Sequence, residues 1–201
     1  MFIRTNDSAR GFTTLELTIA VLITGVIAAI ATPKITNAMR EYRVSIAVRQ
    51  ITDLVQRAKV QAISENHTVA LRVDTANNRA GLVVYDANNN NTEVRVDYIP
   101  LPGGVTFAMP AGVTAPVTGA PTARSVSFAL KAGSTTIYEQ SFTSRGFPAV
   151  AAGTMNAIYV GSNNRSYRAL TLNSVGGMRT WTWRTNQWDD TRHTSTTGQG
   201  Y

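Results

Sequence analysis

An apolar run from Phe12 to Ala31 constrains this chain more than any other feature of its sequence. The run holds twenty residues, most of them Ile, Val, Leu and Ala. As an α-helix it would be about 30 Å long, which matches the thickness of a bilayer's hydrocarbon core. We therefore predict a transmembrane helix segment over residues 12–33.

The residues before this run predict a leader that is removed. Residues 1–11 are polar and carry Arg4 and Arg10. An ordinary secretory signal has a shorter apolar core, and its cleavage site follows that core. Here the candidate cleavage point, Gly11, comes before the apolar run, so cleavage there leaves the helix attached to the product.

Glu16 is the one charged residue within the apolar run. A carboxylate in a membrane helix costs up to about 2.5–3.5 kcal/mol at the bilayer centre, and less near its edge. Cleavage after Gly11 gives Phe12 a free amine one helical turn before Glu16, in the same subunit or in a neighbour. The two charges attract strongly in an apolar setting and offset much of their desolvation. The alternative is a tolerated glutamate at the membrane interface.

The hexapeptide GFTTLE at 11–16 resembles the prepilin peptidase site of type IV pilins and pseudopilins. The resemblance implies cleavage after Gly11 by a prepilin peptidase and N-methylation of Phe12. It also implies an assembly role for Glu16. Gly25 and Pro33 fall where pilin helices are weakened, and Pro33 lacks the N–H that a helix interior needs, so we expect a helix break there.

The charges beside the run do not set its orientation. Arg4 and Arg10 precede it, whereas Lys34, Arg40 and Arg43 follow it, and long translocated domains largely escape the positive-inside rule. The leader favours a single-pass inner-membrane protein with its head in the periplasm.

A second helical segment, residues 34–66, is predicted to be amphipathic. Its apolar residues follow the spacing of one helix face, and we expect the helix to stop near Asn66 and to pack on a sheet. This apolar stripe consists of Ile51, Leu54, Val55, Ala58 and Ala62.

The rest of the chain alternates strand-like segments with turn residues such as Asn77-Asn78. The predicted strands are 68–74, 80–86, 92–98, 125–130, 136–142, 157–161, 167–172 and 178–183. We expect an α+β, pilin-like fold, in which the long N-terminal helix packs on an antiparallel β-sheet head at 67–188. Residues 103–122 are predicted to form a surface loop, and residues 189–201 a flexible tail.

Three further segments resemble the GspH/FimT family of pilin-like proteins. They are QRAKVQAISENHTVALRV (56–73), FTSRGFP (142–148) and VGGMRTWTW (175–183). The resemblance implies a minor subunit of a type II secretion pseudopilus or a type IV pilus. Its implied partners are other pilins or pseudopilins, an inner-membrane assembly platform and membrane lipid.

Some FimT-type members bind DNA, which is the alternative function. The net charge of +7 and the isoelectric point of about 10.1 favour acidic partners. The candidate DNA-binding residues are Arg165, Arg168, Arg179 and Arg184. Where DNA-binding members have Gly-Arg-x-Arg, this chain has Gly177-Met178-Arg179-Thr180. Trp181 and Trp183 could stack on bases or face the core.

No catalytic constellation is visible, so we predict a non-enzymatic protein without metal or cofactor. The chain has no cysteine, which excludes disulfides and thiolate zinc sites. Its two histidines, His67 and His193, lie far apart in the sequence. Asp189-Asp190 is a weak calcium ligand set without further oxygen donors.

Overall fold

The computed structural model describes residues 12–86, 92–113, 115–116, 120, 122, 124–150, 155–162, 166–184 and 187–190. The chain divides into two compact units, Met1–Met39 and Arg40–Tyr201.

The first unit consists, where described, of the N-terminal part of one long helix, α1, which runs from Thr14 to Ser64. Residues 12–30 are all exposed, including every large apolar side chain among them. The helix contains an 18-residue window with a mean hydropathy of 2.2, no part of which is buried. It is thus long and apolar enough to cross a membrane.

α1 is not interrupted at Gly25 or Pro33, contrary to the predicted break. A proline removes one backbone N–H, and the helix continues through Pro33 without it. Thr32 Oγ1 donates to the Ala28 carbonyl at 2.7 Å, and Thr36 Oγ1 donates to the Pro33 carbonyl at 3.0 Å. A local weakening of the helix at these two positions stays a prediction.

The helix ends where the sequence predicts. Ser64 is its last residue, and Asn66 has a φ of 53°, a left-handed conformation that asparagine tolerates after a helix end. The Asn66 N–H donates to the Ile63 carbonyl at 3.3 Å, and the chain then enters the first strand.

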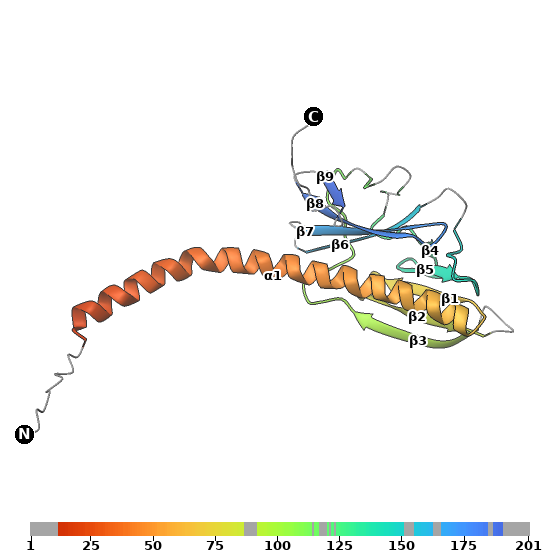
Figure 1. The fold of residues 1–201 in the computed structure, drawn as a ribbon, viewed down its shortest axis with the longest axis horizontal. Helices are drawn as coiled ribbons and strands as arrows, with labels where there is room; N and C mark the ends of the chain where they lie inside the picture. The colour runs from red at the N-terminus through yellow and green to blue at the C-terminus, as the bar shows by residue number, and fades with distance from the viewer. Residues whose placement is uncertain are drawn as a thin grey trace, which may run out of the picture. The chain divides into compact units, whose positions relative to one another are not determined.

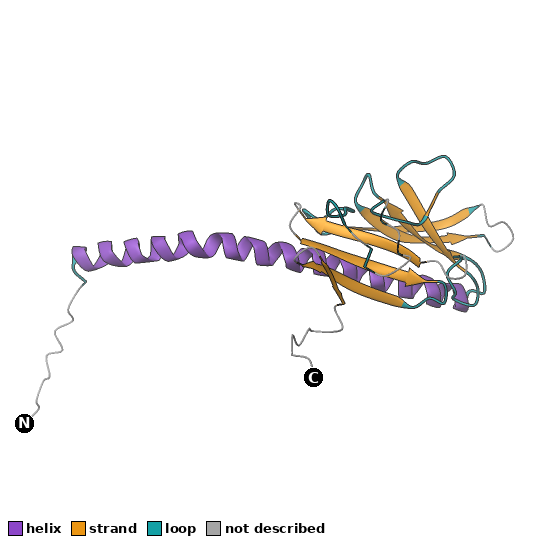
Figure 2. Cartoon of the chain, turned by 90° about the horizontal axis from the view of Figure 1, so that it is seen from above, coloured by secondary structure: helices purple, strands orange, loops and turns teal. Residues whose placement is uncertain are grey.

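The second unit, the head, adds two antiparallel sheets to the C-terminal part of α1 (Figures 1 and 2). The five-stranded sheet, sheet A, has the order β3-β2-β1-β5-β4, and the four-stranded sheet, sheet B, has the order β6-β7-β8-β9. Sheet A contains β1 (Val69–Asp74), β2 (Arg79–Tyr85), β3 (Glu93–Pro100), β4 (Ala129–Leu130) and β5 (Ile137–Phe142). Sheet B contains β6 (Met155–Ser162), β7 (Ser166–Asn173), β8 (Met178–Arg184) and β9 (Gln187–Asp190). The predicted fold class is confirmed, with two sheets in the head.

Two strand predictions need correction. The strand expected at 125–130 shrinks to β4, because Val126 makes only an isolated bridge to Ile158 of β6. β9 was not predicted, and it includes Asp189 and Asp190, which were assigned to the tail. Its Trp188 makes ring contacts with Trp183 of the neighbouring strand β8 and with Tyr159 of β6, which lies two strands further along sheet B.

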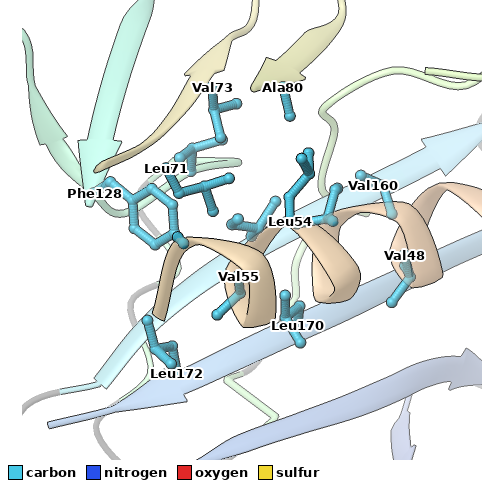
Figure 3. Packing of buried hydrophobic residues seen from close by; sticks show 14 of the residues in the cluster. Val48, Leu54, Val55, Leu71, Val73, Ala80, Phe128, Val160, Leu170 and Leu172 are labelled. Carbon is cyan, nitrogen blue, oxygen red and sulfur yellow. The ribbon is translucent and has the colours of Figure 1, made fainter. Parts of the chain in front are cut away.

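The core forms around the amphipathic half of α1. All five residues of the predicted stripe are buried, and Val44, Ala47 and Val48 extend it toward the N-terminus. Figure 3 shows how side chains from α1 meet Leu71 and Val73 of β1 and Leu170 of β7. Both sheets therefore bury apolar side chains against the same helix.

The predicted surface loop at 103–122 belongs partly to the core. Val105 and Phe107 are 3% and 9% exposed. Thr106 exchanges two backbone hydrogen bonds of 2.9 Å with Gly161 of β6. Among the described residues, this segment thus covers part of an edge of sheet B, which its Gly- and Pro-rich composition did not reveal.

Replacing Leu54 by alanine tests the central place of the helix in the head. Leu54 is 4% exposed, so the truncation should lower the free energy of unfolding by about 2–5 kcal/mol. The matched control is Val60→Ala on the same helix, where the side chain is 66% exposed and the expected change is within about 0.5 kcal/mol. Urea unfolding of the full chain in detergent micelles measures both, and equal losses would contradict the assignment of the buried face.

Candidate functional site

The first turn of α1 is closed by a reciprocal pair of hydrogen bonds between Thr13 and Glu16. The Thr13 backbone N–H donates to Glu16 Oε2 at 2.9 Å, and the Glu16 N–H donates to Thr13 Oγ1 at 3.2 Å. Thr13 Oγ1 also donates to Glu16 Oε2 at 3.0 Å. This is a capping box, which satisfies backbone donors that a helix start leaves unpaired.

The capping box places the Glu16 carboxylate close to the new N-terminus that cleavage after Gly11 would create. Gly11 lies outside the described residues, and Phe12 is 91% exposed. Because Glu16 accepts a hydrogen bond from the N–H of Thr13, its carboxylate lies next to the residue whose nitrogen would become the free amine. The geometry also gives Glu16 a second role, as a cap, that needs no charge partner.

The three head segments that resemble the GspH/FimT family meet at the C-terminal end of α1. Lys59 Nζ donates to the Gly176 carbonyl at 2.9 Å, which ties the helix to the turn between β7 and β8. Gly146 has a φ of +77°, and a Cβ there would lie 2.7 Å from Ile63 Cδ1. A Cβ at Gly176 would contact Lys59 and Pro148. These motifs therefore encode the packing of two turns against the helix.

The same junction exposes a set of apolar side chains, which we call the distal patch. Ile63, Phe147 and Val175 are 54%, 49% and 69% exposed, and each adjoins one of the close contacts around Gly146 and Gly176. The patch thus combines one residue from α1 with one from each of the two turns.

Arginines 168, 179 and 184 do not share one face of the head. Strand alternation puts Arg168 and Arg184 on the side of sheet B that faces α1, and Arg179 on the opposite side. Arg165 lies outside the described residues. The predicted DNA-binding set is thus divided between two faces, and no single surface of the described residues carries all of it.

The tryptophans of sheet B pack mainly on one another and on the sheet. Trp181 is 8% exposed, and its Nε1–H donates to Thr171 Oγ1 at 3.0 Å. Trp183 and Trp188 are half-buried and make an edge contact with ring centroids 4.9 Å apart. Trp181 is therefore a core residue, as one of the two predicted alternatives states.

Sheet A carries a charged network that the sequence did not reveal. Arg72, whose side chain is 4% exposed, donates to both Glu93 carboxylate oxygens at 2.9 and 2.6 Å and also to Glu139. Lys131 pairs with Glu93, and the Tyr85 hydroxyl donates to Glu139 at 2.7 Å. The sequence signal for this network was a single arginine, Arg72, among the apolar residues of β1.

A β-bulge aligns this network. The pairing between β2 and β3 shifts by one residue at Val84 and Tyr85, so that Tyr85 pairs with Glu93. Arg72 alternates with Leu71 and Val73, which face α1, so the network lies on the opposite side of sheet A. Its charges pair among themselves, which indicates a structural role.

Replacing Lys59 by methionine tests the junction between helix and turns. The change removes a charge-assisted hydrogen bond and should lower the free energy of unfolding by about 1.5–3 kcal/mol. Arg57→Met, at an exposed position two residues earlier on α1, is the matched control with an expected change within about 0.5 kcal/mol. Thermal or urea unfolding of both variants checks this, and an unchanged Lys59 variant would contradict the junction.

The Arg72 network predicts a defined dependence of stability on pH. Hydrogen bonds from Arg72, then from Lys131, lower the pKa of Glu93 from 4.5 to about 2. The resulting stabilisation is fully present above pH 4.5 and is lost as the pH falls through 2. Glu93→Gln should therefore cost about 1–3 kcal/mol at neutral pH, after allowance for solvent screening, and this cost should shrink toward pH 2.

Unfolding curves of the wild type and of Glu93→Gln between pH 7 and pH 2 measure this difference. Asp53→Asn removes an exposed acid on α1 and controls for the change in net charge. A Glu93 deficit that stays constant down to pH 2 would contradict the ion pairing.

Among the described residues, no group of three His, Cys, Asp or Glu side chains could hold a metal ion.

No family model matches the sequence, and no curated protein matches it significantly. Two solved structures have a similar backbone. The type IV minor pilin FimU of Pseudomonas aeruginosa is 11% identical, with a TM-score of 0.44 over 73% of this chain and 92% of that one. The minor pseudopilin EpsH from the type 2 secretion system of Vibrio cholerae is 13% identical, with a TM-score of 0.42 over 68% and 96%.

Proposed function

We propose that this chain is a minor pilin or pseudopilin, a non-enzymatic assembly subunit of a type IV pilus or a type II secretion pseudopilus. One observation supports this most directly. The N-terminal part of α1 exposes its apolar residues on all sides, and its first turn holds an acid, Glu16, in a capping box. The C-terminal part of the same helix lies in the core of the head. The exposed apolar side chains of the first half of α1 are buried in a filament only when other apolar helices surround them.

In this proposal, prepilin peptidase cleaves after Gly11 and the new amine of Phe12 is methylated. Before assembly, the apolar half of α1 holds the subunit in the inner membrane, with the head in the periplasm. The inner-membrane assembly platform then moves the helix from lipid into the filament. Surrounding pilin helices replace lipid as the apolar environment of residues 12–31.

Glu16 sets the position of the helix among its neighbours during this transfer. An apolar helix can slide along its neighbours, because apolar contacts have no direction. A carboxylate in an apolar bundle is stable only beside a positive charge, which the processed Phe12 amine of the same or a neighbouring subunit provides. The pairing therefore fixes the axial position of each helix.

The distal patch provides a contact surface for a neighbouring head. Ile63, Phe147 and Val175 are large, exposed and drawn from three separate segments. Apolar side chains gathered on an exposed surface mark protein–protein contacts. We propose that another pilin or pseudopilin covers this patch in the filament.

Two substitutions at Glu16 separate its charge from its capping role. Gln keeps the capping box, because either Glu or Gln completes it, but removes the charge. Leu removes both. We expect both variants to enter the inner membrane at wild-type levels and both to be lost from sheared filaments by at least tenfold, measured by quantitative immunoblotting of filament and membrane fractions.

The glutamine variant decides between the two roles. If Glu16→Gln enters filaments as efficiently as the wild type while Glu16→Leu does not, Glu16 acts as a cap and the charge-pairing step is wrong. Thr13→Val serves as a further control, since it removes the hydroxyl of the cap and leaves the carboxylate in place.

A further inference from the structure

β3 is the edge strand of sheet A at the side opposite β4 (Figure 1). It pairs with β2 from Glu93 to Pro100, and no strand of the described residues bonds to its other side. Six of its eight residues are exposed, whereas all six residues of β1 are buried. A free strand edge presents a row of unpaired N–H and C=O groups, which is a template for another extended chain.

A groove of about 650 Å³ lies between β3 and α1. Arg95, Asp97 and Ile99 line its strand side, and Arg57 is among the residues of α1 that line the other side. Asp97 pairs with Leu82 of β2, whose side chain belongs to the core against α1. Side chains alternate between the two faces of a strand, so a strand added beside β3 would turn every second side chain toward α1. The groove provides room for these side chains.

Arg95 and Asp97 give this edge a charge pattern. Their side chains lie two residues apart on the groove side of β3, pair with each other, and are 62% and 54% exposed. Exposed ion pairs contribute little to stability, so both groups can change partner at little cost. Residues directly opposite each other in antiparallel strands interact, and opposite charges are favourable. An antiparallel partner of β3 should therefore have an acid opposite Arg95 and a base opposite Asp97.

The other face of β3 favours apolar partners. Val94, Val96 and Tyr98 alternate with the two charged residues, so they lie on the side of sheet A that faces away from α1. Val94 is 65% exposed. Aromatic and β-branched residues form favourable cross-strand pairs. A complementary strand thus alternates apolar residues with one base and one acid.

We propose that β3 accepts an extended segment of a neighbouring pilin or pseudopilin subunit as an additional antiparallel strand of sheet A. The segment carries a base and an acid two residues apart, which pair with Asp97 and Arg95, and apolar residues on its other face. In this mode of recognition, backbone hydrogen bonds give affinity and side chains give specificity. The neighbouring subunit as the source of the segment rests on the proposed function.

The β3 strand of a second copy has matching charges but the wrong direction. When two β3 strands are aligned antiparallel about Val96, Arg95 of each lies opposite Asp97 of the other. Two copies joined in this way are related by a twofold axis normal to the sheet, and their helices are antiparallel. Subunits anchored in one membrane by the same helix have parallel helices. The match in charge nevertheless defines a probe, the synthetic peptide EVRVDYI with the sequence of residues 93–99.

A charge-exchanged peptide tests the recognition. The probe EVRVDYI and the control EVDVRYI have the same composition, and fluorescence anisotropy of the labelled peptides measures their binding to the full chain in a neutral detergent. We expect the probe to bind at least about tenfold more tightly than the control. The variant with both Arg95→Asp and Asp97→Arg should reverse this preference, because its charges match the control peptide. Both side chains are more than half exposed, so the exchange leaves the core intact.

Three results would overturn the proposed strand site. Equal binding of the two peptides to the wild type would show that Arg95 and Asp97 do not select the partner. Absence of binding by either peptide would show that the two charges only protect a free edge. Dimerisation of the wild type that Asp97→Arg abolishes, measured by analytical ultracentrifugation, would identify a second copy as the occupant.

Photo-crosslinking in cells identifies the source of the strand. Benzoylphenylalanine replaces the exposed Val94, and tandem mass spectrometry identifies the crosslinked segment. We expect a segment of another filament subunit with a base and an acid two residues apart, and a yield at least fivefold lower when Asp97→Arg is also present. Leu130 of β4 is 41% exposed at the opposite edge of sheet A, and the same crosslinker there should not give this product.

The two experiments separate this inference from the proposed function. A crosslink from position 94 to a protein outside the filament would overturn the neighbouring subunit as the source of the strand. Failure of the peptide assay would overturn the strand site and would leave the role of α1 and Glu16 in assembly unaffected.

Discussion

An acid in the first turn of a membrane-length apolar helix is the constraint on which this structure depends. Glu16 is tolerable there because Thr13 donates to it from both its backbone and its hydroxyl. Those bonds satisfy hydrogen-bonding capacity but leave the charge uncompensated. In the proposed function, the amine that cleavage before Phe12 would expose compensates this charge, and processing would then be linked to assembly through one carboxylate.

The rest of the chain packs around the C-terminal part of this helix and forms the head. α1 buries one stripe against two sheets, and the Lys59 hydrogen bond to Gly176 ties its C-terminal end to sheet B. On the outer side of sheet A, Arg72 collects the carboxylates of Glu93 and Glu139 within a closed network. The exposed apolar surfaces named above are the first half of α1 and the distal patch.

Patterns that depend on neighbouring residues were predicted correctly from the sequence. The 3.6-residue stripe from Ile51 to Ala62 gave the buried helix face, and Asn66 gave the helix end. Features that depend on distant residues were missed. β9 exists because Trp188 finds Tyr159 and Trp183 across the sheet, and Arg72 is buried because a bulge in another strand brings Glu93 to it. The face that each arginine occupies likewise depends on strand register, which composition does not encode.

The mass of the mature N-terminus tests the central claim most directly. The protein is extracted from its native membrane, and its N-terminal peptide is sequenced by tandem mass spectrometry. The account predicts a chain that begins at N-methylated Phe12, with its new amine beside Glu16. A mature chain that still begins at Met1 would leave the Glu16 charge without its partner and would contradict the assignment to a pilus or pseudopilus.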